Sequence, residues 1–150
     1  MANGKRSTDH MIALHFYLEI DGITQAKFRE CSGLSSESQV IEYKEADKNG
    51  VTVIKKVPGA IKWSDITLKR GITDVMELWN WRKEVEEGNV DRARKNGSIV
   101  LYNQANMEVA RWNFVECWPS KISGPQLNAA GNEIAVEEVT LVHEGLERVK

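Results

Sequence analysis

The chain has 150 residues, of which 41% are hydrophobic and 28% are charged, and its formal net charge is −2. This length suits one domain with a core of its own, and the missing basic excess argues against a dedicated nucleic-acid binder. Its apolar runs are far shorter than the ~20 residues that cross a bilayer. We expect a single domain over residues 1–150, with a flexible segment at 1–12, made in the cytoplasm without a signal peptide.

Strand patterns dominate the first part of the chain. Apolar and polar residues alternate from Leu14 to Ile20, which is typical of a half-buried strand. Asn49-Gly50 is a preferred pair for a type I′ hairpin turn, whose two central residues both need positive φ. Strands are therefore expected at 14–20, 25–31, 37–46 and 51–57, the last two forming one hairpin.

The hairpin around Asn49-Gly50 is long, charged and weakly patterned. It has little apolar face to bury within its own domain. Two interpretations stay open on these residues alone: a solvated protrusion, or an arm that packs on another subunit.

Residues 57–71 predict a turn, a strand and a break. Pro58-Gly59 is a turn pair, and 61–69 is rich in β-branched and apolar residues, as strands are. Arg70-Gly71 interrupts this pattern.

An amphipathic helix is expected next, because the apolar period changes from two to about 3.6 after residue 72. Thr73 or Asp74 can cap its start, and Gly88-Asn89 marks its end. Trp79 lies on its apolar face and is expected in the core. Trp81 lies at the margin of that face and is a better interface candidate.

The rest of the chain reads as strands and connections. The basic segment 92–96 is expected to be solvated, and Asn103 to Asn106 to form a turn. Pro119 should end a strand because it cannot donate to a ladder. Glu137 and Glu138 should point to opposite faces of a strand and so cannot serve as an acid–base pair. Strands are expected at 98–102, 109–118 and 133–143.

The sequence contains no recognisable catalytic motif. The histidines His10, His15 and His143 have no metal-ligand spacing, and no nucleophile elbow or phosphate-binding loop is present. We expect no catalytic residue, metal or cofactor, and therefore no enzyme. Cys31 and Cys117 are expected to be reduced thiols, with a single disulfide as the alternative.

The expected fold class is mainly β (α+β). Seven or eight antiparallel strands would form two packed antiparallel sheets in a barrel-like sandwich with one flanking α-helix. One function compatible with it is a monomeric β-barrel module that binds a small ligand or peptide through its tryptophans.

Several segments resemble one family when taken together, from about Ala13 to Glu147. They read HFYLEIDG, FRECSGL, VIEYKE, VPGAIKWSDITLKRG, ITDVMELWNW and NEIAVEEVTL. The combination resembles the tube protein of contractile phage tails and of extracellular contractile injection systems.

That resemblance implies a structural subunit that forms hexameric rings, which stack into a hollow tube inside a contractile sheath. Implied partners are the chain itself, a sheath protein, a baseplate or spike hub, a cap or terminator protein, and cargo or DNA in the lumen. The particle would be a phage virion tail or an injection system, with no membrane insertion by this chain. A tube initiator in the baseplate is the alternative with the same fold.

The resemblance also places the inter-subunit arm at the hairpin around Asn49-Gly50. The predicted interface residues are Glu45, Asp47, Lys48, Asn49, Gly50, Val51, Val53, Lys55, Pro58 and Gly59, with Arg70 and Trp81 as further candidates.

Overall fold

The computed structural model describes residues 15–21, 23–126, 131 and 135–150, so the segment predicted to be flexible lies outside the described residues. Ten strands and two helices occur within them. In chain order they are β1 (His15–Ile20), β2 (Ile23–Phe28), β3 (Glu30–Ser32), β4 (Ser36–Ala46), β5 (Thr52–Trp63), β6 (Ile66–Gly71), α1 (Glu77–Glu86), α2 (Val90–Ala93), β7 (Lys95–Tyr102), β8 (Glu108–Ser123), β9 (Val136–Val142) and β10 (Gly145–Arg148).

Eight strands form one antiparallel sheet with the order β2-β1-β7-β8-β9-β6-β3, and β10 also pairs with β8. The 16-residue β8 serves both halves of this sheet. Its first part pairs with β7 and β10, and its last part pairs with β9. Between these parts Glu116 has a φ of 51°, and a bend of this kind lets one strand pass from one sheet layer to another.

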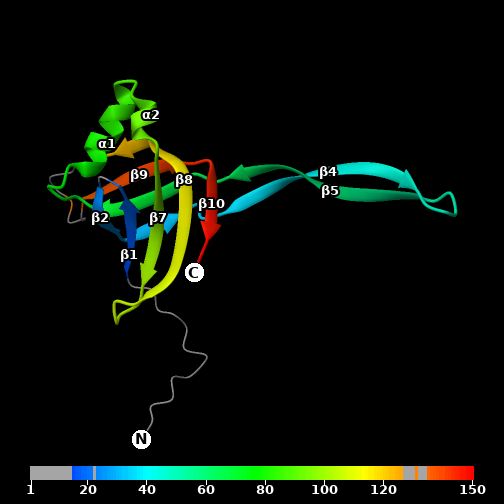
Figure 1. Ribbon diagram of the computed structural model, residues 1–150, viewed down its shortest axis with the longest axis horizontal. Coiled ribbons are helices and arrows are strands. Elements are labelled where there is room, and N and C mark those ends of the chain that lie inside the picture. The colour runs from blue at the N-terminus through cyan, green and yellow to red at the C-terminus, as the bar shows by residue number, and fades with distance from the viewer. Residues whose placement is uncertain (1–14, 22, 127–130, 132–134) are drawn as a thin grey trace, which may run out of the picture.

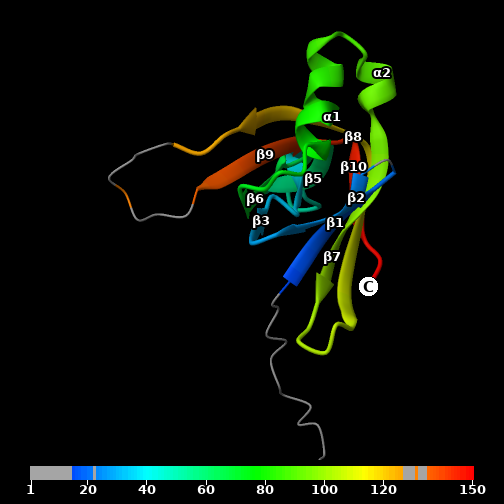
Figure 2. The same cartoon turned by 90° about the vertical axis from the view of Figure 1, so that its left-hand side faces the viewer.

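The core lies between the two halves of the bent sheet. Leu18, Ile99 and Phe114 come from one half, and Leu68, Val139 and Leu141 come from the other. All of these side chains are at most 2% exposed. The helices α1 and α2 stand together at one end of the sheet (Figure 2) and contribute Leu78, Trp81 and Ala93 to the same cluster.

The fold class is confirmed in its coarser form, since the protein is mainly β with helices at its flank. Three details differ from the expectation. The two sheet layers are one continuous sheet, the separate second sheet is the two-stranded β4–β5 hairpin, and the short α2 joins α1. The described pairings do not close a barrel, because β2 and β3, which are neighbours in the chain, end opposite sides of the sheet.

Prolines do not end strands where the sequence predicted. Pro58-Gly59 lies inside β5 instead of forming a turn, and β8 continues past Pro119. Pro58 belongs to a two-stranded hairpin, where each strand has a free edge that tolerates a missing N–H. The break before β6 comes at residues 64–65, and β10 was not predicted.

The burial of the two tryptophans in α1 is the reverse of the expected one. Trp81 is 3% exposed, and its Nε1 donates to the carbonyl oxygen of Ala93 at 2.6 Å. Trp79 is half-buried, and its Nε1 donates to Oε2 of Glu137 at 2.8 Å. The helix α2 explains the exchange, because it covers the side of α1 that the helical pattern assigned to the margin.

A buried ion pair joins β6 to β9. The Nε of Arg70 donates to Oε1 of Glu137 at 2.5 Å, and the two side chains are 8% and 3% exposed. Glu137 therefore points into the core with Val139 and Leu141. The sequence thus places a charge at an inward position of the last strand, where Arg70 balances it.

Candidate functional site

The most prominent feature of the surface is the arm, the hairpin of β4 and β5 that extends away from the body (Figure 1). The strands pair from Ser36 opposite Trp63 to Ala46 opposite Thr52. All residues of β4 are exposed, as are most of β5, and the two strands mainly contact each other. An isolated two-stranded hairpin is only marginally stable in water, so the arm needs a cover that the other described residues do not give it.

The tip of the arm is held by Asp47. Its Oδ1 accepts from the backbone N–H groups of Asn49 and Val51 at 2.9 and 2.8 Å. Gly50 has a φ of 75°, whereas Asn49 is not among the residues with positive φ. The expected type I′ turn is therefore wrong. The tip is a three-residue loop with one left-handed glycine, a common hairpin connection.

The β7–β8 turn repeats this design. Oδ1 of Asn103 accepts from the N–H groups of Ala105 and Met107 at 2.9 and 3.0 Å, and Asn106 has a φ of 56°. The predicted turn at Asn103 to Asn106 is confirmed.

The two faces of the arm differ in chemistry. Directly opposed residues of an antiparallel pair lie on the same face. One face carries what we call the apolar stripe, which consists of Ile41 opposite Val57, Tyr43 opposite Lys55, and Val53 opposite Glu45. The other face carries the ion pair of Glu42 with Lys56, whose nearest atoms are 3.8 Å apart, beside Lys44, Val40 and Ile54.

A β-bulge lies in the arm next to the apolar stripe, on the side nearer the body. The register shifts between Ser38 and Val40, so that Gly59 and Ala60 stand opposite Gln39. A Cβ at Gly59 would lie 3.0 Å from Cδ1 of Ile41, which is tighter than ordinary van der Waals contact. The glycine therefore lets the Ile41 side chain lie across β5.

The base of the arm is tied to the body. The hydroxyl of Ser35 donates to that of Ser64 at 2.8 Å, and Nε2 of His143 lies 3.0 Å from the Ser64 carbonyl oxygen. Gly33 has a φ of 91°, and a Cβ there would lie 1.8 Å from the backbone oxygen of Asp65. Only glycine fits at this close approach of the two backbones, and the approach sets where the arm leaves the sheet.

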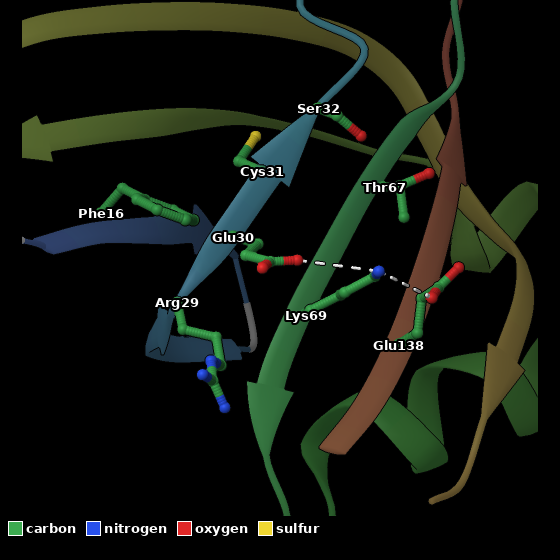
Figure 3. A pocket seen from close by; sticks show the side chains of 8 residues that line it. All are labelled: Phe16, Arg29, Glu30, Cys31, Ser32, Thr67, Lys69 and Glu138. Carbon is green, nitrogen blue, oxygen red and sulfur yellow. Dashed lines mark ion pairs between the residues drawn. The ribbon is translucent and has the colours of Figure 1, made fainter.

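The strand β3 pairs only with β6, so its outer edge has no partner strand within the described residues. A shallow hollow of about 480 Å³ lies at this edge. Figure 3 shows Phe16 and Cys31 on one side of β3, and Lys69 between Glu30 and Glu138 on the other. An unpaired strand edge is a template for pairing with another chain.

The hollow is lined by an exposed ion-pair network and a thiol of raised pKa. The ammonium of Lys69 lies 3.6 Å from Glu30 and 3.8 Å from Glu138, and all three side chains are more than 40% exposed. Exposed pairs of this kind contribute little to stability. Burial raises the pKa of the Cys31 thiol to about 12, so the thiol stays protonated at neutral pH and is a poor nucleophile. Both cysteines are free.

The structure places the predicted interface residues in two different environments. The ten predicted interface residues between Glu45 and Gly59 all lie on the arm. Only Val53 and Gly59 among these ten are half-buried. Arg70 and Trp81 are 7% and 3% exposed, respectively. Their side chains are committed inside this chain, which corrects their assignment to a surface. Contact of the arm with another copy stays a prediction.

The sequence analysis missed the stripe residues Ile41, Tyr43 and Val57. Their i, i+2 spacing on either side of the Asn-Gly turn was the available signal, since the register of a hairpin follows from its turn. It also missed an exposed apolar segment before α1, formed by Ile72, Val75 and Met76.

Two other kinds of site are absent from the described part of the chain. No group of three or more His, Cys, Asp or Glu side chains is placed to hold a metal ion. Neither helix there is long and apolar enough to span a bilayer.

Comparison with protein families gives one match that covers nearly the whole chain. The model of the T4-like virus tail tube protein gp19 matches residues 12–147. The chain belongs to the T4-like virus tail tube protein family. It is therefore a structural subunit of a tube, as the resemblance implied. A comparison with curated proteins gave no match.

Solved structures agree with this family. A chain of the sheath–tube complex of an extracellular contractile injection system, PVC, in the extended state has a TM-score of 0.78 and 27% identity, over 95% of this chain and 93% of that chain. A chain from the tube-terminating cap of the anti-feeding prophage has a TM-score of 0.78 and 26% identity, over 99% and 96%. Hcp1 from Flavobacterium johnsoniae has a TM-score of 0.59 and 16% identity, over 90% and 94%, and shares the fold.

Proposed function

We propose that this tail tube protein forms hexameric rings that stack into the hollow inner tube of a contractile tail or injection particle. The observation that carries the proposal is the arm, which exposes apolar side chains on both faces and whose two strands, among the described residues, mainly contact each other. Apolar surface of this kind marks a protein–protein contact. In this role the chain works mechanically, without a catalytic residue, metal or cofactor.

The free sheet edges support the same proposal. The outer edge of β3 has no partner strand in the part of the chain that the structure describes, and pairing it with a sister copy would remove an aggregation-prone edge. A contact between two different surfaces repeats from copy to copy and closes into a ring when the rotation allows. Stacking of such rings would then extend the tube.

We assign the lumen to the outward face of β3, β6 and β9. Its opposed residues form one row of Glu30, Lys69 and Glu138 and a second row of Ser32, Thr67 and Thr140. The opposite face of these strands is the core. A hydrophilic wall with its charges paired lets DNA or protein cargo pass without adhering.

The proposed partners follow from the solved complexes. The PVC structure is a complex of sheath and tube, and the anti-feeding prophage structure is a cap that terminates the tube. By analogy, a sheath protein would surround this tube, a cap would end it, and a baseplate hub would begin it. The particle would assemble in the bacterial cytoplasm and act after release.

Sedimentation velocity and negative-stain electron microscopy over a concentration series test the proposal. We expect rings or tubes from the full chain, and a folded monomer from a variant in which a short Gly-containing turn replaces residues 41–57. If the full chain remains a compact monomer at the highest concentration, the assembly role is refuted. Copy number per particle separates the main tube subunit from a tube initiator.

The lumen assignment has its own test. In assembled tubes, Thr140→Cys should react with a small maleimide but not with a bulky polyethylene-glycol maleimide. Equal reaction with both reagents would place this face outside the tube.

A further inference from the structure

Exposed apolar side chains are concentrated in two places. Thirteen large hydrophobic residues are strongly exposed among the described residues, and seven of them belong to the arm. Three more lie between β6 and α1, where Ile72, Val75 and Met76 are 58%, 44% and 56% exposed. We call these three residues the helix-entry patch. Exposed apolar patches mark interaction sites, so we consider the two surfaces together.

The helix-entry patch is a preformed surface. The N–H of Ile72 donates to the carbonyl oxygen of Ala135 at 3.0 Å. The N–H of Val75 donates to Oγ1 of Thr73 at 3.3 Å, and its carbonyl oxygen accepts from Nη2 of Arg70 at 3.5 Å. The backbone is thus held at both ends of the segment while its apolar side chains face outward. Binding to such a surface costs little ordering of the chain.

The patch and the arm lie at opposite ends of the molecule (Figure 1), where the connection between β6 and α1 faces away from β4 and β5. The arm of one copy cannot reach the patch of the same copy without folding back. A contact between the arm of one copy and the patch of the next is heterologous, and such contacts close into a ring when the rotation between copies allows.

We propose that the apolar stripe of the arm docks on the helix-entry patch of a neighbouring copy. This inference rests on the proposed function and names the surface that receives the arm. The stripe is the better docking face because its apolar residues Ile41, Val57 and Tyr43 are adjacent, whereas the Glu42–Lys56 pair separates Val40 from Ile54 on the other face. Ile41, Tyr43 and Val57 are 49%, 47% and 37% exposed, so all three have area to lose.

The stripe carries both Lys55 and Glu45, and its lysine offers a charge that can pair with the neighbouring copy. Lys55 stands opposite Tyr43 within the stripe. The exposed Asp74 lies between the patch residues Ile72 and Val75, and the charge of the neighbouring Arg70 is paired with Glu137 inside the chain. A Lys55–Asp74 pair at the rim would set the register of docking more than its strength.

Disulfide trapping tests the contact. Tyr43→Cys combined with Met76→Cys should give disulfide-linked oligomers under mild oxidation of assembled protein. The control is Ile54→Cys with Met76→Cys, which places the thiol on the opposite face of the arm. The native cysteines interfere little, because Cys117 is fully buried and Cys31 remains protonated.

A charge exchange gives a second readout in case the cysteines disturb assembly. Lys55→Glu and Asp74→Lys should each raise the concentration needed for half-assembly by about tenfold, and the two together should restore it. Lys44→Glu on the opposite face is the matched control and should change it less than the two single variants do.

The outcomes separate the two proposals. Trapping by the Tyr43 pair but not the Ile54 pair, with rescue in the double charge variant, supports docking on the patch. Rings that form without Tyr43 trapping or rescue overturn the docking site and leave the tube role standing. A chain that never self-associates overturns the tube role itself.

Discussion

The carboxylate of Glu137 accepts one hydrogen bond from the sheet and one from the helix α1. The variant Glu137→Ala therefore tests how α1 is fixed to the body. Oε1 accepts from Nε of Arg70 at 2.5 Å, and Oε2 accepts from Nε1 of Trp79 at 2.8 Å. Alanine would leave the guanidinium of Arg70 buried at 8% exposure without a counter-charge. Its remaining contacts would be the Val75 carbonyl oxygen at 3.5 Å and the ring of Phe28, with Cζ 5.7 Å from the ring centroid.

The expected magnitude follows from that geometry. Deleting one partner of a buried ion pair costs about 3–5 kcal/mol, because the other charge stays buried. Trp79→Phe removes one charge-assisted hydrogen bond and keeps the pair, so it should cost about 1.5–3 kcal/mol. Replacing both charges, as Arg70→Met with Glu137→Leu, should be close to neutral, since apolar replacements of buried pairs often are.

Urea denaturation followed by circular dichroism measures these free energies of unfolding. It should be done where sedimentation shows one species, because assembly adds apparent stability by mass action. Glu138→Ala is the control, since its side chain on the same strand is 41% exposed and should cost less than about 1 kcal/mol. The reasoning fails if Glu137→Ala and Glu138→Ala lose the same stability, or if the double replacement is less stable than Glu137→Ala.

Three further predictions concern single residues. The Cys31 thiol, with its pKa raised to about 12, should react slowly with maleimide at pH 8 and rapidly only in denaturant; equal rates would contradict its burial. Gly33→Ala should lower the melting temperature more than Gly88→Ala, because both have positive φ but only the former meets a backbone oxygen; equal shifts would contradict the clash. Asp47→Ala should weaken ring formation seen by sedimentation, whereas Asp47→Asn should not, since Asn103 accepts the same two bonds in its own turn; identical behaviour of the two variants would refute the role of that acceptor.

Local patterns predicted much of this fold. Alternation from Leu14 to Ile20 marks β1, and the residues around Asn49-Gly50 and Asn103 mark both long hairpins. A protruding hairpin could be inferred without coordinates, because a long, charged hairpin with little apolar face to bury packs poorly within its own domain; whether it contacts another subunit stayed open on these residues alone. The apolar stripe and the two outer edges of the hairpin follow once the register of its strands is known.

Other elements have no local signal. The four residues of α2 are too few to show a helical period, and β10 forms because β8 offers it an edge. The strand β8 runs through Pro119 because Leu141 of β9 pairs with it there. Pairing between distant segments decides such cases, and it overrides the preferences of single residues.

The sequence by itself determined the mainly β character, the family and the existence of a protruding hairpin, since these depend on alternation, turn residues and quoted segments. Only the tertiary structure decided which side chains are inside. It buried Trp81 under α2 and turned Glu137 inward to meet Arg70. The physical reason is that a charge or an indole can be buried only where a distant partner satisfies it, and that partner is set by the fold and not by the neighbouring residues.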